Sequence, residues 1–138
     1  MGVPASTEAR LFYRCAGQRY EESKILRKAE HRTGAIYLAG YSVECMLKAM
    51  ILQSVPRSRQ RQVLESFRGN RGHDFEWLRA YYLREGGAHF PTTVTRSFAL
   101  VNDWSTEMRY LPRVIRPSEA DAFLRATDSI ISWADGRL

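Results

Sequence analysis

The sequence predicts an all-α protein, an antiparallel up-and-down bundle of four to five helices that forms a single domain over residues 1–138. Apolar residues recur at helical spacing through several long segments, and no segment alternates polar and apolar residues between hairpin turns. No internal repeat of about 20 to 50 residues is present. With 44% hydrophobic and 12% aromatic residues, 138 residues suffice for one core.

The first predicted helix covers residues 6–30. Leu11, Cys15, Ile25 and Ala29 recur in it at helical spacing, which predicts that they face the core. The only other cysteine, Cys45, lies on the next predicted helix. Two separated thiols form neither a disulfide framework nor a zinc quartet, so we expect a reduced cytoplasmic protein without a metal.

The second predicted helix begins at Thr33, a good N-cap residue, and ends at Ser54, before Val55-Pro56. It is long enough to cross a bilayer, but Glu44 and Lys48 lie within it. We therefore interpret it as a buried helix and expect no membrane partner. The N-terminus also lacks the basic and apolar regions of a signal peptide.

A basic connector follows. We expect one or two helical turns over residues 60–67 and then a Gly-Asn-Arg-Gly loop. The whole chain has 18 arginines, 3 lysines and a formal charge of +6, and arginine favours bidentate contacts with phosphate or carboxylate. An anionic partner and a merely solubilising surface are both consistent with this charge. The connector contains only one acid, Glu65, and five arginines. These are Arg57, Arg59, Arg61, Arg68 and Arg71.

Three shorter helices complete the expected bundle. His73-Asp74 opens a helix through Arg84, with Asp74 as its cap, and Gly86-Gly87 stops it. A helix over residues 91–104 and a terminal helix over residues 118–134 follow. The residues expected to face the core are Phe75, Leu78, Tyr82, Val94, Phe98 and Val101, with Leu100 as a further candidate. Ser118 to Asp121 is expected to form a variant capping box.

One line on the second helix carries most of its polar side chains. Tyr37, Tyr41, Glu44 and Lys48 lie at positions i, i+4, i+7 and i+11, beside Gly40, where another backbone or a ligand can approach. One interpretation is a Glu-Lys pair on a partly solvated edge. The other is a polar groove at a dimer interface or ligand cleft.

A second candidate is WSTEMRY, with Trp104, Glu107, Arg109 and Tyr110. Trp104 can anchor this corner in the core while Arg109 and Tyr110 present a guanidinium and a phenol to a phosphate or base. Alternatively, Glu107 and Arg109 pair with the second helix. We expect Glu44 and Lys48 to meet this corner or the same face of a second subunit.

A third candidate is the pair Arg68 and His73, which have four residues between them, including Arg71. Metal-free RNA cleavage needs a group that moves the 2′-hydroxyl proton and a cation that stabilises the phosphate charge. Alternatively, His73-Asp74 is a helix cap whose imidazole bonds a neighbouring carbonyl. No Gly-rich phosphate loop, metal-ligand spacing or Gly-x-Ser-x-Gly elbow is present, so we expect no cofactor.

Taken together, AIYLAGYSVECMLKAMIL, HDFEWL and WSTEMRY, in this order, resemble the HEPN family of small bacterial and archaeal helical domains. The match extends from Ala35 to Tyr110. The resemblance implies a helical bundle that forms a homodimer, with its functional cleft at or near the dimer interface. No cofactor is implied.

The family divides into two functional classes, and each implies a function here. Many members are metal-independent endoribonucleases of toxin–antitoxin systems, with an arginine and a histidine four to six residues apart. Arg68 and His73 meet that spacing, with glycine after the arginine. Others bind nucleotide, RNA or a nucleotidyltransferase partner. We expect this chain to belong to the second class. The residues that we expect to bind the phosphate are Lys48, Arg68, Arg71 and Arg109.

Overall fold

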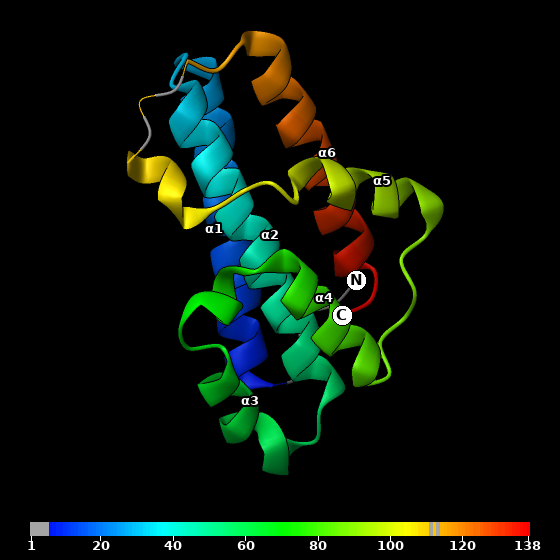
Figure 1. The fold of residues 1–138 in the computed structure, drawn as a ribbon. Helices are drawn as coiled ribbons and strands as arrows, with labels where there is room; N and C mark the ends of the chain where they lie inside the picture. The colour runs from blue at the N-terminus through cyan, green and yellow to red at the C-terminus, as the bar shows by residue number, and fades with distance from the viewer. Residues whose placement is uncertain (1–5, 111, 113) are drawn as a thin grey trace.

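The computed structural model describes residues 6–110, 112 and 114–138, without the side chain of Arg109. Every regular element in these residues is helical, as predicted (Figure 1). The described residues form six α-helices, one more than the upper limit we expected, because the helical turns of the basic connector form an α-helix of their own, α3. The elements are α1 (Thr7–Lys28), α2 (Arg32–Ser54), η1 (Arg57–Arg59), α3 (Gln60–Ser66), η2 (Asn70–His73), α4 (Phe75–Arg84), α5 (Thr92–Val101), η3 (Thr106–Tyr110) and α6 (Pro117–Asp135), where η marks a 3-10 helix.

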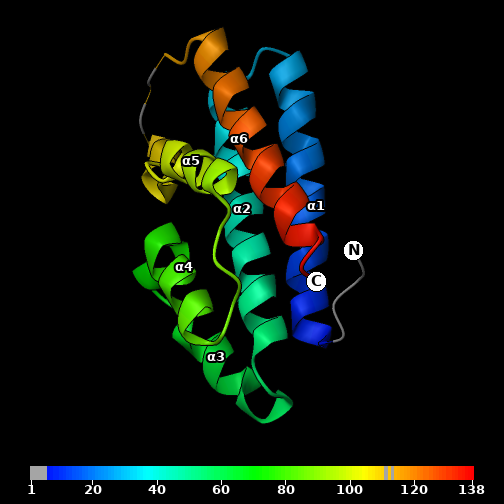
Figure 2. The same cartoon turned by 90° about the vertical axis from the view of Figure 1, so that its right-hand side faces the viewer.

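The helix α2 is the centre of the fold. It packs against α1, α4, α6 and η3, and Figure 2 shows it between α1 and α4. Among the described residues it is the one helix long and apolar enough to span a membrane, with a mean hydropathy of 1.4 over its most apolar window. Of that window, 78% is buried inside the molecule. Its apolar residues therefore form the protein core.

The face that α1 turns to the core differs from the predicted one. Leu11 and Ile25 are 58% and 65% exposed, and Ala29 is exposed as well, so the predicted burial of these three residues is wrong. Ala9, Ala16 and Ser23 are fully buried instead. These three small residues are seven positions apart and lie on one face, where they let α1 approach its neighbours closely.

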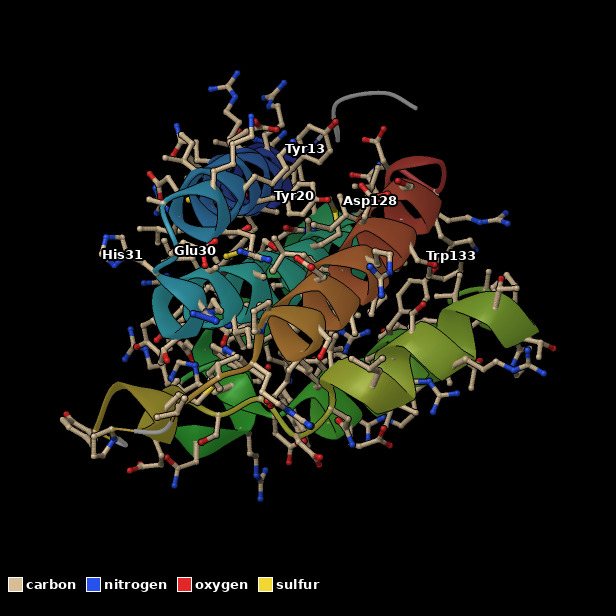
Figure 3. All side chains as sticks on the ribbon, turned by 90° about the horizontal axis from the view of Figure 1, so that it is seen from above. Tyr13, Tyr20, Glu30, His31, Asp128 and Trp133 are labelled. Carbon is tan, nitrogen blue, oxygen red and sulfur yellow. The ribbon has the colours of Figure 1, made fainter. Side chains whose placement is uncertain are left out.

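A row of three polar contacts joins α1 to α6. Tyr13 donates to Asp135 Oδ1 at 2.6 Å, and Tyr20 donates to Asp128 Oδ1 at 2.9 Å (Figure 3). The third contact joins Arg27 Nε to Asp121 Oδ1 at 2.7 Å. Partner numbers rise by seven on α1 and fall by seven on α6, so the two helices run in opposite directions along this row.

Glu30 and Pro56 mark the two ends of α2. Glu30 has a φ of 66°, a left-handed conformation that reverses the chain between α1 and α2. His31, rather than the predicted Thr33, is the N-cap residue. The predicted end at Ser54, before Val55-Pro56, is confirmed.

The predicted start of α4 is confirmed. Asp74 Oδ1 accepts a hydrogen bond from the backbone N–H of Trp77 at 3.2 Å, which satisfies a donor of the first turn. Phe75, Leu78 and Tyr82 are buried. The helix ends before Gly86, which has a φ of +89°.

The last two helices differ from prediction at their ends. The helix α5 ends at Val101, before Trp104, and buries Val94, Phe98 and Val101 as predicted, whereas the further candidate Leu100 is 47% exposed. Residue Arg116 is the N-cap of α6, and no side chain caps that helix. The predicted capping box from Ser118 to Asp121 is wrong, because Pro117 already occupies the first turn and the Asp121 carboxylate binds Arg27.

Candidate functional site

The site begins with a buried ion pair on α2. Lys48 Nζ donates to Glu44 Oε2 at 2.8 Å, and the two residues are 6% and 4% exposed. The predicted Glu-Lys pair therefore exists, but in the core rather than on a solvated edge. Two buried charges need further partners, because their own attraction replaces only part of their lost hydration.

The further partner of Glu44 is His73. Its Nδ1 lies 2.9 Å from Glu44 Oε1, so the carboxylate uses both oxygens. An ionised carboxylate only accepts hydrogen bonds, so Nδ1 carries the proton and donates it to Glu44. The other ring nitrogen, Nε2, takes no part in this bond. The predicted bond from this imidazole to a backbone carbonyl is wrong. The His73 side chain is 41% exposed, so the buried pair ends at a ring that reaches solvent.

Two phenylalanine rings complete the surroundings of Lys48. Its Nζ lies 5.6 Å from the ring centre of Phe12 and 5.3 Å from that of Phe67, within the range of cation–π attraction. Gly72 closes the same space. A Cβ there would lie 1.8 Å from the carbonyl oxygen of Phe67 and 3.4 Å from Lys48 Nζ. The loop before His73 is thus held in place by a backbone approach that only glycine allows.

A cluster of aromatic rings lies beside the ion pair. Trp104 donates from Nε1 to the carbonyl of Tyr37 at 3.2 Å and covers Gly40, where a Cβ would lie 2.0 Å from that nitrogen. The Tyr41 ring meets Trp104 edge to face at 5.0 Å and His73 at 6.3 Å. Tyr41 therefore connects the indole to the imidazole.

The arginines of the loop before α4 are exposed. Neither the Arg68 nor the Arg71 side chain bonds or pairs with any described residue, whereas Arg59 pairs with Glu85. Two unpartnered guanidinium groups thus lie on the six-residue segment that ends at His73. We call Tyr37, Tyr41, Arg68, Arg71 and His73 the His73 face.

The segment WSTEMRY, from Trp104 to Tyr110, which we call the Arg-Tyr corner, contacts a different part of α2. Its helix η3 packs against α2, but Glu107 is exposed and Tyr110 is 67% exposed. The side chain of Arg109 lies outside the described residues. Trp104 docks this corner at Gly40, one turn before Glu44, whereas Glu44 and Lys48 contact His73, Phe12 and Phe67. The expected contact of Glu44 and Lys48 with Arg109 rests on a side chain outside the described residues and stays a prediction.

One feature of the sequence indicates that the backbone comes close to another group near His73. Gly72 precedes His73, and glycine often marks a close backbone approach. The contact between Glu44 and His73 spans 29 residues and depends on how α4 docks on α2. Local spacing carries no information about such a pairing.

The described residues hold no group of three or more His, Cys, Asp or Glu side chains that could ligate a metal ion. Glu44 and His73 alone supply two donors, fewer than the three or four protein ligands of a typical zinc site. The arrangement instead suits proton transfer or contact with an anion. No family model, curated protein or solved structure matches this chain.

Proposed function

We propose that this chain is a HEPN-like dimeric module that binds nucleotide or RNA phosphate at the His73 face. One observation carries the proposal. The Arg68 and Arg71 side chains are exposed, have no partner among the described residues, and lie five and two positions before His73, whose imidazole a buried carboxylate holds in place. Lys48 is left out of the phosphate contact, because it is buried and paired with Glu44.

The chemistry of this face supports a phosphate chain rather than an uncharged ligand. Arginine forms two parallel hydrogen bonds with phosphate oxygens, and a formal charge of +6 attracts a polyanion. Tyr37 and Tyr41 are half-buried, their rings meet at 5.1 Å, and the Tyr41 ring lies 6.3 Å from that of His73. Aromatic rings beside basic side chains suit single-stranded nucleic acid, whose bases stack on them.

Fluorescence anisotropy with a 5′-labelled single-stranded RNA tests this proposal. We expect Arg68→Ala/Arg71→Ala to weaken binding at least about tenfold, since each change removes charged hydrogen bonds. Arg96→Ala is the control, because Arg96 is exposed on α5 and has no partner in the described part of the chain. Equal affinity of both variants would refute phosphate binding at the His73 face.

A second function, metal-independent endoribonuclease activity, is favoured by the Glu44–His73 contact. A carboxylate on Nδ1 fixes the orientation of the ring, so that Nε2 would exchange protons with a substrate hydroxyl. Arg68 would neutralise the phosphate. Incubation with RNA in EDTA tests this activity. Cleavage that His73→Ala abolishes and Arg96→Ala retains would establish it, and no cleavage by the wild type would exclude it for that RNA.

The proposed module works as a homodimer in the cytoplasm. It pairs with a nucleotidyltransferase or another toxin–antitoxin partner. Its helices form an antiparallel up-and-down bundle. Leu11 and Ile25 support an interface, since both are exposed apolar side chains of α1, fourteen positions apart and so on one side of the helix. Light scattering on the purified chain tests the dimer. We expect twice the chain mass of 15.9 kDa, and Leu11→Glu/Ile25→Glu to give the monomer.

A further inference from the structure

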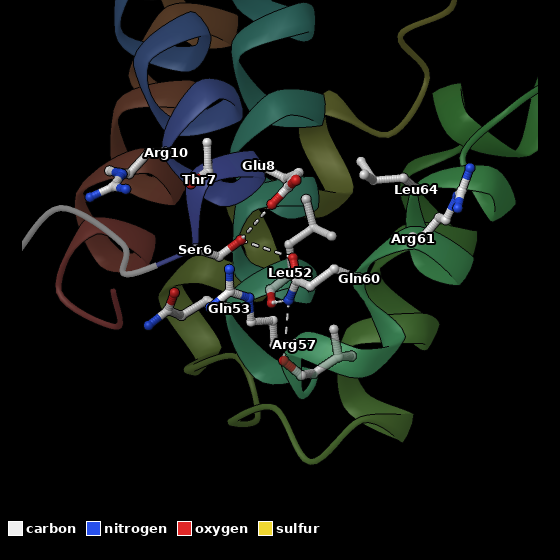
Figure 4. A pocket seen from close by; sticks show the side chains of 11 residues that line it. Ser6, Thr7, Glu8, Arg10, Leu52, Gln53, Arg57, Gln60, Arg61 and Leu64 are labelled. Carbon is white, nitrogen blue, oxygen red and sulfur yellow. Dashed lines mark hydrogen bonds between the residues drawn. The ribbon is translucent and has the colours of Figure 1, made fainter.

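A cavity of about 910 Å³ lies at the opposite end of α2 from its start, away from Gly40 and the Arg-Tyr corner. It is formed by the start of α1, the end of α2, η1 and α3 (Figure 4). Small-molecule sites in proteins typically measure about 300 to 1,000 Å³. This cavity therefore has room for a ligand larger than a single inorganic ion.

The charged side chains of this cavity are mostly arginines. Arg10 of α1, Arg57 of η1 and Arg61 of α3 line it, against one acid, Glu8, which gives the lining a formal charge of +2. None of the three arginine side chains bonds or pairs with a described residue. Figure 4 shows Arg57 turned toward Ser6 and Arg61 on the other side of the opening.

The floor of the cavity is polar and fixed. Gln60 is 8% exposed and donates from Nε2 to the carbonyls of Leu52 at 2.6 Å and Val55 at 3.2 Å. Its Oε1 accepts from the Ser6 hydroxyl at 2.9 Å. Gln60 thus occupies the carbonyls at the end of α2, which would otherwise repel an anion. The first turn of α1, capped by Ser6, adds positive partial charge to the same space.

We propose that this cavity is a binding site for a small molecule with two or more phosphate groups. Three arginines on three different elements line the cavity, and a ligand with several phosphate groups offers oxygens to more than one of them. The lining contains no aromatic ring, so recognition rests on the phosphates rather than on stacking of a base. The site is independent of the proposed RNA contact, because it shares no residue with the His73 face.

Isothermal titration of the full chain with pyrophosphate at constant ionic strength tests the site. We expect one equivalent to bind, and Arg57→Ala/Arg61→Ala to weaken it at least about tenfold. Both side chains are exposed and unpartnered, so the variant should fold like the wild type, which circular dichroism checks. Arg96→Ala removes one charge at a distant position and should leave the affinity unchanged.

A further variant and a further ligand separate this site from the alternatives. If Arg68→Ala/Arg71→Ala abolishes pyrophosphate binding and the Arg57/Arg61 variant does not, the phosphate lies on the His73 face and the cavity proposal is wrong. Citrate carries three carboxylates but no phosphate. Citrate binding as tight as that of pyrophosphate would overturn the assignment to phosphate, and no pyrophosphate binding at all would overturn the site.

Discussion

The ion pair of Glu44 and Lys48 gives the sharpest energetic test of the fold. Glu44→Gln keeps the size of the side chain and removes the negative charge next to a lysine that is 6% exposed. Breaking a buried pair on one side costs about 3 to 5 kcal/mol, because the other charge stays buried without a counter-ion. The retained amide oxygen still accepts one hydrogen bond, so we expect about 3 kcal/mol. For a chain of this size that lowers Tm by about 12 °C.

Thermal and urea unfolding measure this loss, and two further variants interpret it. Glu21→Gln is the matched control, because Glu21 also accepts from a lysine at 2.8 Å but is 67% exposed. It should cost less than about 0.5 kcal/mol. Glu44→Gln/Lys48→Met should recover most of the stability, since no charge stays buried. A loss below about 1 kcal/mol for Glu44→Gln would refute the reasoning.

Three more predictions follow from single contacts. Gly40→Ala puts a methyl group where the Trp104 indole lies, so we expect the free energy of unfolding, measured in urea, to fall by at least about 2 kcal/mol. An unchanged free energy of unfolding would mean that the indole moves freely. Cys45 is half-buried, and burial raises the pKa of its thiol to about 12, so a thiol reagent at pH 8 should modify it far more slowly than a free thiol. Modification at the rate of a free thiol would contradict this. Burial and the bond to Asp128 raise the pKa of Tyr20 above its usual 10.0, so the folded state holds the proton more tightly. The stability that this proton contributes is complete below pH 10 and is lost as the pH rises through the pKa of Tyr20 in the folded state. Tyr20→Phe should therefore lessen the fall of Tm in alkali. An unchanged fall would contradict the raised pKa of Tyr20.

Local chemistry in the sequence was enough to predict the helical class and several boundaries. Asp74 has the side chain that caps a first turn, and Pro56 cannot continue a helix, so α4 begins and α2 ends where expected. The inner face of α1 could not be predicted this way. Ala16 and Ser23 carry little hydrophobic signal, and their burial follows from the close approach of neighbouring helices.

The candidate site could be predicted only in part. Helical spacing placed Glu44 next to Lys48, because residues four apart share a face. It could not place His73, whose contact with Glu44 depends on the docking of α4 and on the tight loop at Gly72. Nor could it predict the α1–α6 row, in which each partner lies about a hundred residues away in the sequence.

The salt dependence of RNA binding tests the central claim, that unpartnered arginines beside His73 contact phosphate. For single strands, the slope of log K against log salt concentration is about −0.7 for each neutralised phosphate. We predict that Arg68→Ala/Arg71→Ala makes this slope shallower by about 1.4, while Arg96→Ala leaves it unchanged. Parallel lines for the wild type and both variants would contradict the claim.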